Sequence, residues 1–273
     1  MNFREEEHPR DSDGKFTDGL GIPKMQKSTS LLDGKGESKY SDRFRQYDHI
    51  DDLENYYIKN CGNMTTNEMD AVEAALEHRN YTKIVPNVDE WADNLNQDEL
   101  NAIKFYCGRN SYNLNSNIRN GMIAGMRDDY KQVMNNLDCA INSFELQKPI
   151  KVYRGIRTEA LEKMLGKSIV DDFGRINDFS GCKFIDKAFV SCSVSPQAVK
   201  DYINSTIHTE NESVVSLQID LPKGKGIGAP IDSISFIPQE QEFLLARNLP
   251  LEIVDIVGDK GHYKVRCRYA NNN

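Results

Sequence analysis

The sequence predicts an α+β protein in which helices come first and a mostly antiparallel set of strands follows. Between residues 46 and 145 the apolar residues recur with the period of helices. After Pro149 they gather in short runs of β-branched and aromatic residues, which is the pattern of strands. The sequence shows no regular strand–helix alternation and no G-x-G-x-x-G after a strand, which argues against a Rossmann dehydrogenase.

The chain divides into two parts of different composition. Residues 1–45 place Gly and Pro among Ser, Asp and Lys without an apolar period, so we expect a polar, disordered extension. Residues 46–273 are expected to form the folded domain, with a helical part over 46–145 and a strand-rich part over 149–270.

Two of the expected helices begin with a capping signal. Thr65 precedes Glu68 by three residues, and Asn96 precedes Glu99 in the same way. In each pair, the side chain of either residue can accept a hydrogen bond from the backbone N–H of the other. A weaker helix is expected over 118–126. The apolar positions on the helical faces are Met69, Val72, Leu76, Leu100, Ile103, Cys107, Tyr130, Val133, Met134, Leu137 and Ile141. Such faces usually pack in the core.

The second half of the chain carries the strand signals. Two helices, near 158–165 and 196–204, interrupt the strands. The strands are expected at 150–154, 188–193, 213–220, 241–247, 251–257 and 262–269.

Composition argues against several classes of function. The formal net charge is −8, so the basic surface typical of nucleic-acid binding is lacking. No apolar run reaches the length of a membrane span, and the first residues do not resemble a signal peptide. We expect a cytoplasmic protein, in the producing or an infected cell, or one delivered with a virion or by a separate translocation system. The six scattered cysteines predict reduced, mostly buried thiols.

Arg154 ends an apolar strand and is followed by Gly155. A guanidinium beside a residue without a side chain suits recognition of a phosphate, because the ligand can approach the backbone. Taken alone, an arginine at this position is more often simply an exposed residue at a strand end.

Two serines alternate on the expected strand 188–193. Ser191 and Ser193 should point to one face of the sheet, and Cys192 to the other. Hydroxyls are common in strands, so this pattern alone indicates little.

Two glutamates precede the apolar run of the strand 241–247. In a regular strand Glu240 and Glu242 would face the same way, about 7 Å apart. Like charges placed together before a buried run are costly unless a site uses them, although a solvated edge strand would also explain them. The preceding loop, 231–239, carries Phe236 and Ile237.

Taken in order, these three features resemble the Arg-Ser-Glu pattern of mono-ADP-ribosyltransferases, especially the iota-toxin-like and clostridial exoenzyme group. Asn115–Arg119 is similar to the helix that contributes an asparagine to NAD in that family. The resemblance spans residues 95–269 and implies a two-sheet core of that family's type. Two positions depart from the pattern. Cys192 replaces the usual threonine between the serines, and Ser111 stands where a tyrosine is expected, with Tyr112 one position late.

The resemblance implies that NAD is the substrate and gives a role to each residue of the pattern. Glu242 would stabilise the oxocarbenium-like ribose formed as nicotinamide leaves, and Ser191 would hold Glu242. Arg154 would bind an NAD phosphate, and Gly155 would leave room for the nicotinamide amide. The remaining contacts to NAD would come from Asn115, Ser193 and Tyr202, although Tyr202 could equally be a core residue of its helix.

Glu240 would serve the acceptor. In the family, glutamate at this position goes with an arginine target, whose guanidinium it can orient and deprotonate. Phe236 and Ile237 would recognise the acceptor protein. The resemblance implies no metal, and we expect a monomer with no nucleic-acid partner.

Two other functions stay open. If water replaced the acceptor, the same site would be an NAD glycohydrolase. If the transferase fold were inactive, the chain would be a phage virion or interaction protein. The latter reading rests on His8–Phe16, which resembles a segment of tailed-phage head and portal-associated proteins.

Overall fold

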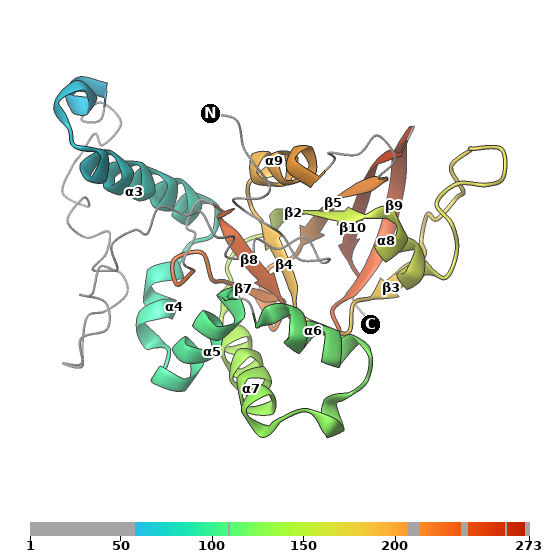
Figure 1. Cartoon of the computed structure of the whole chain (residues 1–273), viewed down its shortest axis with the longest axis horizontal. Helices are drawn as coiled ribbons and strands as arrows, with labels where there is room; N and C mark the ends of the chain where they lie inside the picture. Colours follow the sequence, from blue (N-terminus) through green and yellow to red (C-terminus); the bar gives the residue numbers. More distant parts are fainter. Residues whose placement is uncertain (1–57, 109, 207–212, 236–239, 260, 271–273) are drawn as a thin grey trace.

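The computed structural model describes residues 58–108, 110–206, 213–235, 240–259 and 261–270 (Figure 1). The expected extension 1–45 and the phage-like segment within it lie outside these residues. None of the described helices is long and apolar enough to cross a membrane.

Helices make up the first half of the described chain, as the sequence predicts. They run in the order η3 (Cys61–Asn63), α3 (Thr66–Ile84), α4 (Val88–Asn94), α5 (Gln97–Cys107), α6 (Ser111–Arg119), η4 (Ile123–Gly125) and α7 (Asp128–Ser143). The capping box at the start of α5 is present, with Asn96 and Glu99 each accepting from the other's backbone N–H at 2.9 Å.

The prediction of a helix over 118–126 is wrong. The helix of this region is α6, which ends at Arg119, and the chain turns at Gly121 with φ of 70°. A backbone in this left-handed conformation cannot continue a right-handed helix. Only the short turn η4 follows, where the sequence had suggested a continuing helix.

Strands dominate the second half, interrupted by α8 (Thr158–Leu165) and α9 (Pro196–Thr206). They are β1 (Glu145–Leu146), β2 (Ile150–Arg157), β3 (Lys183–Ile185), β4 (Val190–Ser193), β5 (Val214–Leu221), β6 (Gly224–Lys225), β7 (Gly228–Pro230), β8 (Glu242–Leu245), β9 (Pro250–Asp259) and β10 (His262–Tyr269). The α+β class is therefore confirmed.

Eight of these strands form one sheet in the order β3-β9-β10-β5-β2-β4-β8-β7, and β1 pairs with β6. Among the described strands β10 and β5 run parallel, and the other pairs are antiparallel. β2 and β4 are joined at one residue pair, Tyr153 with Ser193. This narrow junction divides the sheet into five-stranded and three-stranded halves, which correspond to the two sheets that the resemblance implies.

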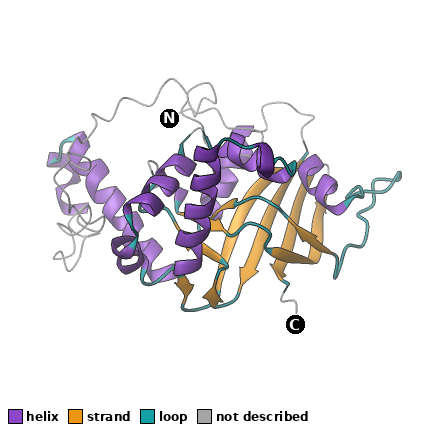
Figure 2. Cartoon of the chain, turned by 90° about the horizontal axis from the view of Figure 1, so that it is seen from below, coloured by secondary structure: helices purple, strands orange, loops and turns teal. Residues whose placement is uncertain are grey.

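Helices cover the sheet on both sides of this junction (Figures 1 and 2). α9 contacts β2, β4 and β5, while α7 contacts β6 and β7 and packs against α5. One apolar cluster runs from the helices through both halves of the sheet and includes the buried rings of Tyr106, Phe189 and Phe243. The junction between β2 and β4 is thus held on a continuous core.

The cysteines correct one expectation. Cys192 and Cys267 are buried and Cys107 is intermediate, but Cys139 and Cys182 are exposed. All five are free thiols, so the part of the prediction that made them mostly buried is wrong. The two exposed cysteines lie at surface positions of α7 and of the loop before β3.

Candidate active site

Arg154, Ser191 and Glu242 meet at the junction of the two sheet halves. The Ser191 hydroxyl donates to Oε1 of Glu242 across β4 and β8. Arg154 Nη1 on β2 donates to the carbonyl oxygen of Ser191 at 2.5 Å. Glu242 is 1% exposed, so its carboxylate is held in a largely desolvated position. The three residues that sequence placed far apart therefore form one connected group.

The other residues of the serine strand support the same region. Ser193 donates to the carbonyl of Glu240 at 2.6 Å, and its oxygen accepts from the N–H of Ser195 at 2.9 Å. Ser193 thus ties the residue before α9 to Glu240, two residues before β8. Cys192 is buried, and this burial raises the pKa of its thiol to about 12, against the lowering effect of Arg154. A thiol of this kind is unreactive at neutral pH.

Glu240 and Glu242 are not related by the alternation of a regular strand. β8 begins at Glu242, and Gln241 before it has φ of 47°. The left-handed backbone conformation of Gln241 changes the direction of the chain between the two glutamates. Glu240 is therefore partly exposed, whereas Glu242 is buried. The strand expected over 241–247 is accordingly shorter.

The peptide of Glu242 is held by two residues that the sequence analysis did not single out. The Tyr81 hydroxyl on α3 donates to the Glu242 carbonyl at 2.8 Å. Asp232 donates its own N–H to that carbonyl at 3.2 Å, and its Oδ1 accepts from the Glu242 N–H at 3.3 Å. Both residues are buried.

Other acidic groups lie near the buried Asp232. Burial raises the pKa of Asp232 well above its ordinary range, and the nearby carboxylates of Glu242, Glu77 and Glu240 raise it further. The hydrogen bond from the Glu242 N–H acts in the opposite direction. Burial, with Asp232 and Glu242 nearby, also raises the pKa of Tyr81. These acidic side chains are not arranged as a cation site, since no group of three or more ligating side chains within the described residues could hold a metal ion.

Gly155 lies beneath the ring of Tyr202. A Cβ at this position would come within 2.4 and 2.7 Å of two Tyr202 ring carbons and 3.1 Å of Ile203. Tyr202 is buried where its ring packs over Gly155, as a core residue of the helix would be. Close packing of α9 on β2 is therefore sufficient to explain the glycine, and the predicted NAD contacts of Gly155 and Tyr202 stay predictions.

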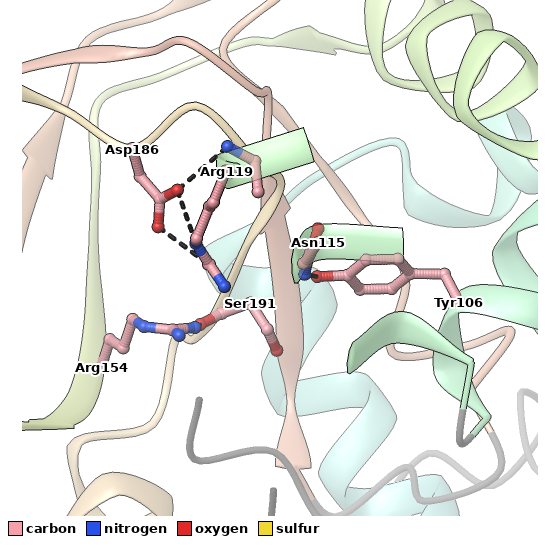
Figure 3. A network of polar contacts seen from close by, with 7 residues as sticks. Tyr106, Asn115, Arg119, Arg154, Asp186 and Ser191 are labelled. Atoms are coloured by element: carbon pink, nitrogen blue, oxygen red, sulfur yellow. Dashed lines mark hydrogen bonds and ion pairs between the residues drawn. The ribbon is translucent and has the colours of Figure 1, made fainter. Parts of the chain in front are cut away.

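Asn115 lies on α6 and is buried (Figure 3). Its Nδ2 donates to the hydroxyl of Tyr106 on α5 at 3.0 Å, and its Oδ1 is buried without a hydrogen-bond partner among the described residues. Tyr106 thus contacts the asparagine directly, whereas Tyr112 is 42% exposed. The predicted contact of Asn115 with NAD stays a prediction, because its amide is buried in this structure.

Arg119 lies one helical turn after Asn115 and bonds Asp186 through two parallel contacts of 2.9 Å (Figure 3). Asp186 also accepts from the Ala188 N–H at 2.9 Å, so this pair joins α6 to the chain that enters β4. Arg119 thus holds the chain that enters β4, while Arg154 contacts Ser191 within β4 (Figure 3).

The acceptor loop is partly described. Residues 231–235 are buried, with Ser233 at 0% and Ile234 at 3% exposed. As placed, these residues are not available to contact a protein. Phe236 and Ile237, predicted to recognise the acceptor, lie outside the described residues.

Comparison with known proteins decides the family. Residues 85–269 match the family described as ADP-ribosyltransferase exoenzyme. The chain belongs to this family. The matched range contains the whole group formed by Arg154, Ser191, Glu240 and Glu242, and it begins directly after α3.

Individual relatives support the same assignment. A curated relative named NAD(+)–arginine ADP-ribosyltransferase EFV, from Enterococcus faecalis, is 28% identical over 224 residues, which are 80% of this chain and 40% of that protein. This chain therefore spans less than half the length of that relative.

Solved structures show the shared fold. Plx2a, an ADP-ribosyltransferase toxin from Paenibacillus larvae, is 21% identical with a TM-score of 0.57, covering 73% of this chain and 97% of that one. The Clostridium limosum C3 exoenzyme is 16% identical with a TM-score of 0.56, covering 72% and 95%. The expected fold type of the family is confirmed.

Proposed function

We propose that this protein is an NAD-dependent mono-ADP-ribosyltransferase that modifies an arginine of a protein acceptor. The observation that carries the proposal is Ser191, whose hydroxyl holds the buried Glu242 carboxylate and whose carbonyl oxygen accepts from the guanidinium of Arg154. The anion on β8 and the cation on β2, which flank β4, suit two parts of NAD: the ribose on which positive charge develops, and the anionic diphosphate.

Cleavage of the bond between nicotinamide and ribose needs a stabilised cation rather than a general acid. Nicotinamide leaves as a neutral molecule and takes the bonding electron pair, so positive charge develops on the ribose. Glu242 would stabilise that charge, as carboxylates do in glycosidases. Its effect is enhanced because Glu242 is buried, where water screens charges less.

The phosphate side of the site draws on Arg154 and on residues of α6. The guanidinium of Arg154 suits bidentate phosphate contacts. Asn115 would accept a hydrogen bond from NAD through its buried Oδ1. Ser193 would act less directly, because its hydroxyl holds Ser195 and Glu240.

Glu240 supports an arginine side chain as the acceptor of ADP-ribose. A guanidinium nitrogen attacks the ribose carbon, a new C–N bond forms, and the nitrogen loses one proton. Glu240 is partly exposed next to Glu242 and would accept that proton and orient the guanidinium. The name of the Enterococcus relative, which specifies arginine, supports the same acceptor.

The test supplies NAD labelled in its ADP-ribose part to the full chain, with a cell lysate or a small guanidine such as agmatine. Wild-type protein should transfer label to both, and mass spectrometry should locate it on arginine side chains. Glu240→Gln should lower transfer about 100-fold or more while nicotinamide release into water persists. Glu159→Gln, an exposed change on α8, is the matched control.

Two results would contradict the proposal. Nicotinamide release that is equal with and without acceptor, leaving only free ADP-ribose, would identify an NAD glycohydrolase. Absence of any NAD cleavage would leave an inactive transferase fold with an interaction role.

A further inference from the structure

Asp232 occupies the position where the ladder between β7 and β8 ends. The last regular pair of that ladder joins Pro230 to Phe243. One residue earlier on β8, the Glu242 carbonyl still accepts from the N–H groups of Ile231 and Asp232, both at 3.2 Å. The Glu242 N–H meets the Asp232 carboxyl at 3.3 Å in place of a backbone carbonyl. The side chain of Asp232 thus replaces the missing ladder acceptor.

The Glu242 peptide is consequently fixed on both its polar groups. Tyr81 adds a third hydrogen bond to the carbonyl, from α3. The backbone of a strand sets the direction of its side chain, so these bonds help to hold the Glu242 carboxylate where Ser191 meets it.

Asp232 is an unusual residue for this position because it is buried and other acidic groups lie near it. Glu77 and Tyr81 approach from α3, and Glu240 and Glu242 from the chain at β8. Asp232 is 2% exposed. An ionised carboxylate here would be buried among like charges, which is costly, whereas a neutral acid keeps an oxygen that can accept from the Glu242 N–H.

We propose that Asp232 is a positioning residue for Glu242 and that it acts as the neutral, protonated acid. This inference rests on the proposed function for its kinetic consequence, but the protonated state is a property of the folded chain. Asparagine has the same shape and one carbonyl oxygen, so Asp232→Asn should reproduce the neutral acid. Asp232→Ala removes the acceptor.

The kinetic arm compares nicotinamide release from NAD by the full chain and its variants. Asp232→Ala should lower kcat about 10- to 100-fold with little change in KM for NAD, because the carboxylate is misplaced rather than lost. Asp232→Asn should restore kcat to within about threefold of wild type. Ser233→Ala is the matched control, since Ser233 is equally buried and its hydroxyl has no hydrogen-bond partner among the described residues.

The stability arm measures the melting temperature against pH without NAD. The pKa of Asp232 is higher in the folded chain than in the unfolded one, so wild type loses stability as pH rises from about 4 toward the folded value. Asp232→Asn lacks this loss. It should melt about 2–4 °C or more above wild type near neutral pH, and the difference should vanish below about pH 4.

The two arms separate failure of this inference from failure of the proposed function. If Asp232→Asn loses activity as Asp232→Ala does, or melts no higher than wild type at neutral pH, Asp232 acts as an ionised carboxylate and the inference is overturned. If Asp232→Ala keeps full kcat, its positioning role is overturned. If wild type does not cleave NAD, the proposed function fails, and the melting curves alone decide whether Asp232 is neutral.

Discussion

The Ser191 hydroxyl approaches Glu242 from the neighbouring strand and limits the carboxylate to one orientation. Ser191→Ala removes this hydrogen bond to a charged group but leaves the backbone carbonyl that Arg154 contacts. Turnover of NAD should fall about 10- to 100-fold with KM for NAD little changed. Steady-state nicotinamide release measures this, with the exposed Ser180→Ala as control. Equal losses in both variants would show that the hydrogen bond has no special role.

Gly155 allows α9 to sit directly on β2. In Gly155→Ala the added methyl group would overlap the Tyr202 ring, so the free energy of unfolding should fall by about 1–3 kcal/mol. Urea unfolding checks this against Gly125→Ala, because a Cβ at Gly125 meets no atom within 4 Å. If Gly155→Ala is as stable as wild type, the glycine is not required by packing, and the predicted role toward nicotinamide would become the better explanation.

The ion pair of Arg119 and Asp186 joins a helix to the chain that enters the serine strand. Both side chains are partly buried, with 26% and 14% exposed. Asp186→Ala should lower the free energy of unfolding by about 1–3 kcal/mol, and by more than Arg119→Ala, because it also removes the acceptor of the Ala188 N–H.

Denaturant unfolding of both single variants and the double variant tests this coupling. The double variant should lose less stability than the two single losses added together. Arg127→Ala is the control, because its pair with Asp129 is exposed and should contribute less than about 1 kcal/mol. Strict additivity would show that the ion pair does not join these elements.

Strongly patterned elements could be predicted from the sequence, whereas short ones could not. The apolar positions from Tyr130 to Ile141, expected on a helix, lie on α7, and the β-branched strands β5 and β10 were expected close to their observed bounds. β7 reads Gly-Ala-Pro, which has no strand propensity, and it forms an edge strand because it pairs with β8. The strand conformation of β7 therefore depends on its pairing with β8 and not on its own sequence.

Linear motifs likewise revealed only part of the site. Arg154, Ser191 and Glu242 each end or begin an apolar run, so their polar character stood out. Asp232 and Tyr81 did not, since their role depends on contacts with Glu242 from positions 10 and 161 residues away. Such contacts follow from the fold rather than from spacing.

At the scale of the whole molecule, one core connects the helical and strand-rich parts. The single tryptophan, Trp91, is buried on α4 and donates to Ala140 and Ser143 of α7. Denaturant unfolding followed by Trp91 fluorescence and by far-ultraviolet circular dichroism should give one coincident transition. Two separate transitions would divide the proposed domain 46–273 into independently folding parts.

The most direct test of the central claim is the rate of nicotinamide release from NAD by wild type and by Glu242→Gln. Glutamine preserves the size of the side chain and can still accept from Ser191, but it removes the negative charge. The account predicts that wild type releases nicotinamide and that Glu242→Gln, although folded, is slower by about 100-fold or more. Release by Glu242→Gln at the wild-type rate would contradict it.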